Sequence, residues 1–190
     1  MTQAAPFLLV IIVIALVLTA IAIAAGNKLA RLKQLVRESW AQLDVALKRR
    51  YDLIPNLVEV CKAYAAHEME VFERVVEARK KAIMVEGSAA KHLSSETALV
   101  ASLNGMLAKV EAYPELKSNQ NFLELQHELA NTEDRIAAAR RFYNANVRDY
   151  NTAQEQFPTS LFSSGHKLAE YFEIEDVQVR HVPPVVFERA

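Results

Sequence analysis

The chain has 190 residues, and its 22 lysines and arginines nearly balance its 23 aspartates and glutamates, giving a formal net charge of -1. Bulk charge therefore does not call for a nucleic-acid partner or a strongly acidic substrate. The length suits one domain rather than two, and the single Cys61 excludes an internal disulfide.

An apolar run covers residues 7–25, interrupted only by Thr19 and free of charge. Such a run is long enough to cross a bilayer as a helix, and we expect a transmembrane helix over 7–26. No basic residue precedes the run, whereas four basic residues follow it, which we expect to lie beside lipid headgroups: Lys28, Arg31, Lys33 and Arg37. This asymmetry predicts that residues 1–6 lie outside and that the chain from residue 27 onward is cytoplasmic.

A cleaved signal peptide is the alternative, because Ala22-Ile23-Ala24 offers small residues of the cleavage type. A signal peptide also needs a basic segment before its apolar core, and residues 1–6 have none. We therefore favour a retained anchor.

After the anchor, apolar residues recur at helical spacing as far as residue 83. The positions expected to face inward are Leu29, Leu32, Val36, Leu43, Leu47, Ile54, Leu57, Cys61, Tyr64, Phe72, Val75 and Ile83. Pro55 lies within this pattern and cannot donate a backbone hydrogen bond, so the helix either kinks or reverses there. Periodicity leaves both alternatives open.

Two more helices are expected, over residues 91–112 and from residue 122 to residue 150. The second has steps of three and four over four heptads, a pattern that seeks partner helices. Its inward positions are Phe122, Leu125, Leu129, Thr132, Ile136, Ala139, Tyr143, Asn146 and Tyr150. Thr132 and Asn146 occupy seam positions where a polar side chain commonly fixes register. Residues 176–187 read as a short extended apolar tail.

Several segments carry a resemblance to the LemA family. The hallmark is Lys48-Arg49-Arg50-Tyr51-Asp52-Leu53-Ile54-Pro55-Asn56-Leu57-Val58. Similar segments follow in order: residues 64–68, Ala78-Arg79, residues 111–119 with Tyr113-Pro114, residues 132–144, residues 147–152 and Phe157-Pro158. The resemblance covers nearly the whole chain, to about residue 172.

The resemblance implies an all-α fold: an antiparallel up-and-down four-helix bundle with long helices on one transmembrane helix, with the N-terminus outside. The expected organisation is a short outer segment 1–6, a transmembrane helix 7–26, a LemA-like bundle 27–172 and an extended tail 173–190. The family supplies no established biochemical activity, although one branch is involved in forming magnetosome membranes. The resemblance therefore indicates fold rather than function.

We recognise no catalytic site in the sequence. Glu124 and His127 form a Glu-x-x-His pair of the kind used in di-iron bundles, but that site needs a second such pair and two further inward carboxylates. Both residues also lie off the apolar seam, so we interpret them as a surface pair. We expect no enzyme activity, no metal and no cofactor.

The family segments contain charged, polar, aromatic and proline residues that we interpret as structural or interaction positions. They are Arg49, Arg50, Asp52, Pro55, Asn56, Tyr113, Pro114, Glu133, Arg140, Arg141, Tyr143, Asn144, Tyr150, Asn151, Phe157 and Pro158. Arginines interleaved with aromatics could grip phosphates. We favour instead pairing of Arg with acids within and between helices, with Asn side chains satisfying the backbone freed at Pro55, and we expect no nucleic-acid partner.

These observations predict a non-enzymatic, membrane-anchored helical scaffold that self-associates and organises or remodels the membrane. The alternative is an adaptor or regulatory subunit that binds a membrane enzyme such as a protease. The expected partners are membrane lipids, further copies of the chain and a membrane protein. The expected location is the bacterial inner (cytoplasmic) membrane, crossed once.

Overall fold

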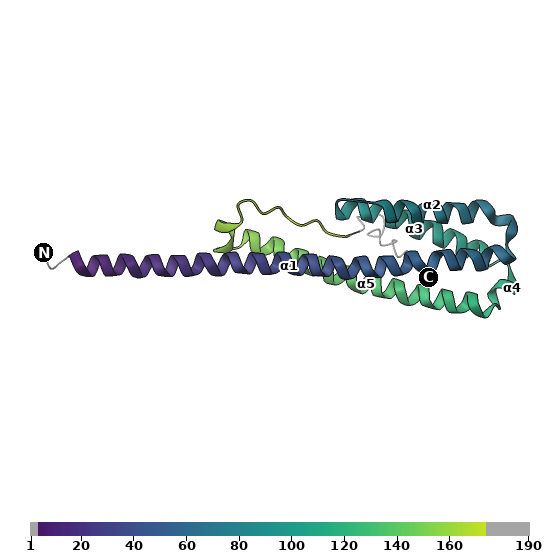
Figure 1. Ribbon diagram of the computed structural model, residues 1–190, viewed down its shortest axis with the longest axis horizontal. Helices are drawn as coiled ribbons and strands as arrows, with labels where there is room; N and C mark the ends of the chain where they lie inside the picture. The colour runs from purple at the N-terminus through teal and green to yellow at the C-terminus, as the bar shows by residue number, and fades with distance from the viewer. Residues whose placement is uncertain (1–3, 174–190) are drawn as a thin grey trace, which may run out of the picture.

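One helix, α1 (Ala4–Tyr64), forms the spine of the molecule. The computed structural model describes residues 4–173, so the tail expected after residue 173 lies outside the described residues. Gly26 lies inside α1, and the expected boundary between residues 26 and 27 is therefore no break in the helix. Figure 1 shows the N-terminal part of α1 projecting alone beyond all other helices.

The apolar run of α1 is exposed along its length. Phe7 and Leu16 keep 69% and 65% of their surface accessible, whereas the core helix of a soluble protein would bury such side chains. The described chain contains one helix long and apolar enough to cross a membrane, and its most apolar window is wholly unburied. These features are consistent with a membrane anchor.

Pro55 neither reverses the chain nor ends α1, so of the two alternatives left open by the sequence, reversal is excluded. The chain turns instead at a short 3-10 helix, η1 (Ala66–Glu68), and α2 (Met69–Met84) then runs back beside α1. Gly87, at a φ of 116° that favours glycine, leads into α3 (Ala89–Val110).

The short helix α4 (Pro114–Lys117) carries the chain into α5 (Gln120–Glu155). Asn119 caps α5 by accepting a hydrogen bond from the backbone of Phe122 at 3.0 Å. Its side-chain amide also donates to the hydroxyl of Tyr64 at 2.9 Å, which ties the end of α1 to the start of α5. A 3-10 helix, η2 (Thr159–Phe162), follows α5.

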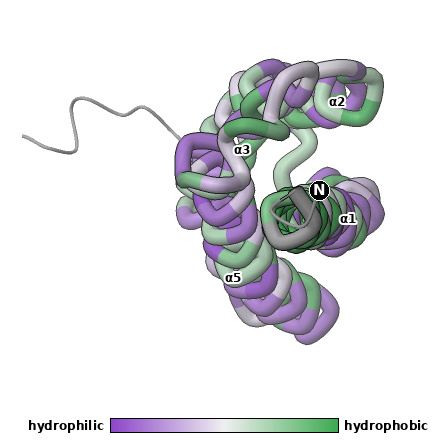
Figure 2. The backbone as a smooth tube through the Cα atoms, turned by 90° about the vertical axis from the view of Figure 1, so that its left-hand side faces the viewer, coloured by the Kyte–Doolittle hydropathy of each residue, from purple (hydrophilic) through white to green (hydrophobic). Residues whose placement is uncertain are grey.

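The helices form two closely packed pairs, α1 with α5 and α2 with α3, and α1 also contacts α2. Figure 2, viewed along α1, shows α2 and α3 to one side of α1 and α5 to another. The backbones of α3 and α5 do not pack closely, and a pocket lies between them. The all-α class is confirmed, and the described residues contain no strand; a regular closed four-helix bundle is not.

The predicted inward stripe of α5 is largely confirmed, since Phe122, Leu129, Thr132, Ile136, Tyr143 and Tyr150 are buried. Two inward expectations are wrong: Tyr64 and Ile83 are exposed, at 38% and 48%. Tyr64 lies at the end of α1, where the chain turns, and Ile83 belongs to the outer face of α2. The periodicity of α2 therefore contains two apolar faces, of which only one enters the core.

Candidate functional site

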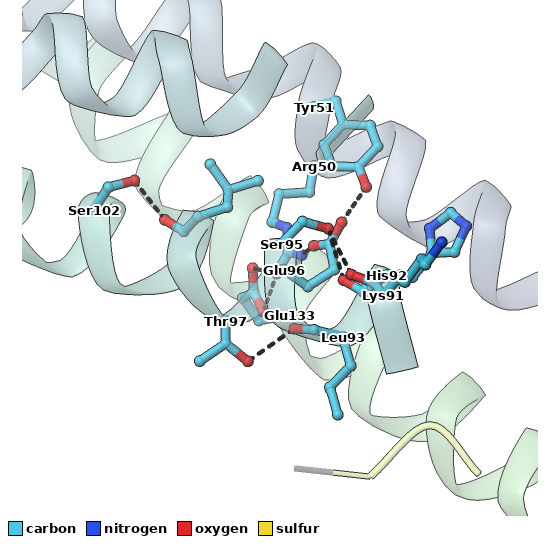
Figure 3. A network of polar contacts seen from close by, with 11 residues as sticks. Arg50, Tyr51, Lys91, His92, Leu93, Ser95, Glu96, Thr97, Ser102 and Glu133 are labelled. Atoms are coloured by element: carbon cyan, nitrogen blue, oxygen red, sulfur yellow. Dashed lines mark hydrogen bonds and ion pairs between the residues drawn. The ribbon is translucent and has the colours of Figure 1, made fainter. Parts of the chain in front are cut away.

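A buried ion-pair cluster joins α1, α3 and α5, and Figure 3 shows it from close by. Arg50 is only 2% exposed. One of its guanidinium nitrogens donates to both carboxylate oxygens of Glu133, at 3.0 and 3.1 Å, and the other forms an ion pair with Glu96. Burying an arginine is costly unless its charge is paired, and the two carboxylates pair it through both terminal nitrogens, while the buried Nε makes no hydrogen bond.

Glu96 also accepts a hydrogen bond from the hydroxyl of Tyr51. Burial raises the pKa of Tyr51, outweighing the lowering effect of the neighbouring Arg50. The phenol therefore remains protonated at neutral pH and acts as a donor. The charged groups of the cluster pair with one another. This arrangement is suited to holding the helices in register rather than to proton transfer.

The cluster borders a pocket of about 380 Å³ between the helices. Most of its walls are apolar, with Leu47, Leu93 and Phe172 among them. Arg140, half-buried, also lines it. A concave apolar surface with a few polar groups is typical of a place that receives a ligand or a partner's side chain.

An extended segment, residues 163–173, lies along α5 and closes one end of this region; we call it the strap (Figure 1). Asn144 donates to the carbonyl of Phe172 at 3.1 Å and accepts from its amide at 2.9 Å. Asn151 makes the same pair of bonds with Ala169, at 2.9 and 2.8 Å. Tyr143 adds a hydrogen bond to the carbonyl of Glu170 at 2.9 Å.

The spacing of the two asparagines explains why both can hold the strap. Seven residues of helix rise about 10.5 Å, and three residues of extended chain span about 10 Å, so Asn144 and Asn151 meet Phe172 and Ala169 in step. Each amide side chain imitates the edge of a β-strand. Phe172 is consequently buried, with its ring edge-on to Trp40 at a centroid distance of 5.9 Å.

The remaining predicted residues separate into surface and structural positions. Arg49 forms an exposed ion pair with Glu128 at 2.7 Å, and Pro114 occupies the first turn of α4. Tyr150 packs with Leu29 and Ala153, and Tyr113 is partly buried against the core. Exposed positions are Asp52, Pro55, Asn56, Arg141, Phe157 and the basic residues Lys28, Arg31, Lys33 and Arg37, while Pro158 is half-buried.

The sequence indicated pairing of arginines between helices, and Arg49 and Arg50 confirm it. The expectation that an asparagine side chain satisfies the backbone at Pro55 is wrong. Asn56 is exposed, and Arg79 instead donates to the carbonyl of Tyr51, at 2.6 Å. Glu96 was missed altogether. Its spacing of three from both Leu93 and Leu99 puts a carboxylate on an inward stripe, a signal that could have identified it.

Glu124 and His127 lie side by side on an exposed face of α5, as the sequence suggested. Among the described residues no group of three or more His, Cys, Asp or Glu side chains is arranged to hold a metal ion. Thr132 is buried, but its hydroxyl donates to the carbonyl of Glu128 within α5, so it does not bond across the seam.

A comparison with known proteins identifies the family of this chain. The sequence model of the LemA family matches residues 39–187. This chain belongs to the LemA family. The matched region contains the ion-pair cluster, the pocket between the helices, and Asn144 and Asn151, which bond the strap.

Curated relatives of this LemA-family chain include two kinds of protein. It is 28% identical to the magnetosome protein MamQ of Magnetospirillum gryphiswaldense over 159 residues, covering 70% of this chain and 58% of the relative. It is 29% identical to magnetosome protein MamQ 2 of Paramagnetospirillum magneticum over 157 residues, covering 68% and 58%.

Protein LemA of Metamycoplasma hominis is 26% identical over 137 residues, covering 70% of this chain and 61% of the relative. The chain thus spans about three fifths of the length of these curated relatives. The relatives and the exposed apolar helix together are consistent with a membrane-associated protein.

Proposed function

We propose that this protein is a non-enzymatic, membrane-anchored helical scaffold whose copies associate laterally and organise the membrane around them. The observation that carries the proposal is α1 itself. One uninterrupted helix joins an exposed apolar run to the buried core of the helical domain. A continuous helix transmits the orientation of the domain to the membrane, as a flexible linker would not.

The proposed topology places residues 7–25 across the bacterial inner membrane, residues 1–6 outside and the helical domain in the cytoplasm. The basic residues directly after the apolar run support this orientation, because positive charge is retained on the cytoplasmic side. An antiparallel four-helix arrangement of α1, α2, α3 and α5 is part of the proposal. It is supported by the alternating directions of these helices in Figure 1.

Lateral association has a candidate surface on α2. Met69, Val76 and Ile83 lie seven residues apart and are exposed by 44%, 45% and 48%. Residues at this spacing share one helical face, and heptad-spaced apolar residues are the pattern by which helices pair. We call this face the α2 stripe. Copies anchored in one membrane meet with their α2 helices in the same orientation, so a parallel pairing across a two-fold axis would cover it.

The test is the mass of the full-length protein in mild detergent, measured by light scattering over a range of concentrations. We expect an assembly, and we expect Val76→Lys to reduce its mass. Val45→Lys is the matched control, since Val45 is an equally apolar residue, 67% exposed, on α1. A wild-type monomer at all concentrations would contradict the scaffold, and equal effects of both substitutions would contradict the α2 stripe.

The alternative function is an adaptor or regulatory subunit that binds one membrane enzyme. The pocket between α1, α3 and α5 supports this alternative, because its apolar walls could receive a partner's side chain. Crosslinking in membranes separates the two proposals. Crosslinks between copies favour the scaffold, and stoichiometric crosslinks to a second protein favour the adaptor.

A further inference from the structure

The turn after α5 exposes a group of large apolar side chains. Phe157 is 81% exposed, Leu161 is 65% exposed and Phe162 is 38% exposed. The turn itself is ordered: the amide of Ser160 bonds the carbonyl of Gln156 at 2.8 Å, and Thr159 is buried beneath it. A fixed backbone therefore presents these side chains outward.

This turn lies at the membrane end of the helical domain. Helix η2 packs against both α1 and α5, and Figure 1 shows it beside α1 on the side toward the N-terminus. Leu29 packs with Tyr150 and Ala153, so the residues that follow Ala153 lie beside α1 at a level before Leu29. Ala25, one turn before Leu29, is only 4% exposed. The turn is thus level with the end of the apolar run.

Bilayer dimensions place this level at the membrane surface. Residues 7–25 form about 28 Å of helix, close to the hydrocarbon thickness of about 30 Å, and the headgroup layer extends several ångströms beyond. Ala25 then marks the boundary between hydrocarbon and headgroups. Aromatic and aliphatic side chains at that depth can insert into lipid, as those of interfacial segments do.

Charge near the turn fits an anionic lipid surface. A surface hollow of about 380 Å³ beside the strap is lined by Lys33, Arg37 and Lys167, with no acidic side chain among its lining residues. Lys28 and Arg31 lie closer still to the end of the apolar run. Basic residues near a membrane surface are attracted by anionic lipids within a Debye length.

We propose that the side chains of Phe157, Leu161 and Phe162 insert into the interfacial layer of the bilayer that α1 crosses, as a second lipid contact of the same domain. The inference rests on the proposed function, since it needs α1 to be an anchor. A second contact beside α1 restricts the tilt and rotation of the helix, which a single spanning helix leaves free. The helical domain would then stand at a defined angle to the membrane.

The experiment uses the full chain in vesicles of phosphatidylcholine and phosphatidylglycerol, with a nitroxide label on Leu161→Cys. The label's collision rates with membrane-soluble oxygen and with a water-soluble nickel complex report its depth. Leu123→Cys is the matched control, because it is also an exposed leucine and lies near the start of α5. Ile14→Cys reports the anchor. Cys61 is fully buried, and wild-type protein treated with the same reagent checks that it takes no label.

We expect the ratio of oxygen to nickel collisions at residue 161 to be several-fold higher than at residue 123. A water-like ratio at 161 with a membrane-like ratio at 14 would overturn the inference and leave the anchor standing. Water-like ratios at both would overturn both. A label at 161 shielded from both reagents would indicate a protein contact and would also overturn it.

A second variant tests the same insertion without a nitroxide label. Phe157→Trp in vesicles of lipids brominated along the acyl chain should lose several-fold more fluorescence than Leu123→Trp. Equal quenching of the two would contradict insertion.

Discussion

The side chain of Arg79 on α2 donates from Nε to the backbone carbonyl of Tyr51 on α1, at 2.6 Å. Tyr51 is four residues before Pro55, so its carbonyl is the one that a residue other than proline would bond through its amide. Arg79 thus replaces the hydrogen bond that Pro55 cannot make. This replacement is one reason that α1 continues through a proline.

The pairing predicts non-additive mutations. Arg79→Ala should cost about 1–3 kcal/mol of unfolding free energy, because it leaves a partly buried carbonyl without a partner. In a Pro55→Ala background the amide of residue 55 can bond that carbonyl, and the same change should cost less than about 1 kcal/mol. Urea unfolding followed by helical circular dichroism measures both.

The control for this cycle is Arg74→Ala on the same helix. Arg74 makes an exposed pair with Glu70, at 4.0 Å, so its loss should change stability by less than about 1 kcal/mol. If Arg79→Ala costs the same with and without Pro55, the contribution of Arg79 does not come from the freed carbonyl.

Elements with one strong apolar stripe could be predicted from sequence, and α5 shows why. Its steps of three and four continue from Phe122 to Tyr150, and burial follows them. The path at Pro55 could not be predicted, because it depends on Arg79, which is 28 residues from Tyr51 in the sequence. The pattern of residues around Pro55 does not indicate so distant a partner.

The candidate site was predictable in its residues but not in its contacts. Arg50, Glu133, Asn144 and Asn151 all lie in family segments, yet the sequence does not show that Arg50 is buried or that the asparagines hold backbone. Exposure of Ile83 was missed for a related reason. An amphipathic pattern does not say which apolar face meets the core and which meets a partner.

Two adjacent arginines should differ sharply in their effect on stability. Arg50→Ala should cost about 3–5 kcal/mol, because it leaves Glu96, a buried carboxylate, without its counter-charge. Arg49→Ala should cost at most about 1 kcal/mol, because its pair with Glu128 is exposed. Denaturant unfolding of both variants checks the difference.

A double variant tests whether charge pairing explains the effect of Arg50. Arg50→Met combined with Glu96→Leu should recover part of the stability lost in Arg50→Ala, since apolar side chains of similar size can replace a buried ion pair. A double variant less stable than Arg50→Ala would point to packing or hydrogen bonding that the apolar pair cannot supply.

Cys61 should react slowly with thiol reagents. Burial raises the pKa of the thiol from an ordinary value of 9.0 to about 11. Two pKa units lower the thiolate fraction at pH 8 about 100-fold, and the side chain is also inaccessible. Alkylation of native protein with iodoacetamide should therefore be at least about 100-fold slower than alkylation in urea, and comparable rates would contradict a buried thiol.

The same pKa shift predicts a loss of stability at alkaline pH. The folded state holds the proton more tightly than the unfolded state, so the stabilising contribution is complete below about pH 9 and is lost as pH rises through about 11. The full effect is about 3 kcal/mol. Cys61→Ala should unfold with a weaker pH dependence between these values, and an unchanged slope would assign the dependence to other groups.

Replacing Asn144 or Asn151 should loosen the strap and leave the helical fold intact. Each makes two hydrogen bonds with strap backbone, and a typical protein hydrogen bond contributes about 0.5–1.5 kcal/mol. Asn151→Ala should therefore speed hydrogen exchange of the Ala169 amide by about 10-fold or more, since about 1.4 kcal/mol is a factor of ten. Asn131→Ala, an exposed asparagine on the same helix, is the control.

Asn151→Asp separates the two halves of the contact. An ionised aspartate can still accept from the Ala169 amide but cannot donate to its carbonyl, so exchange should be intermediate between wild type and Asn151→Ala. Because the strap joins Phe172 at the pocket to Leu168 near the membrane end, its release should also alter the surroundings of Trp40, which packs on Phe172. A change in Trp40 fluorescence in Asn151→Ala, but not in Asn131→Ala, would show that the strap couples these two ends of the helical domain.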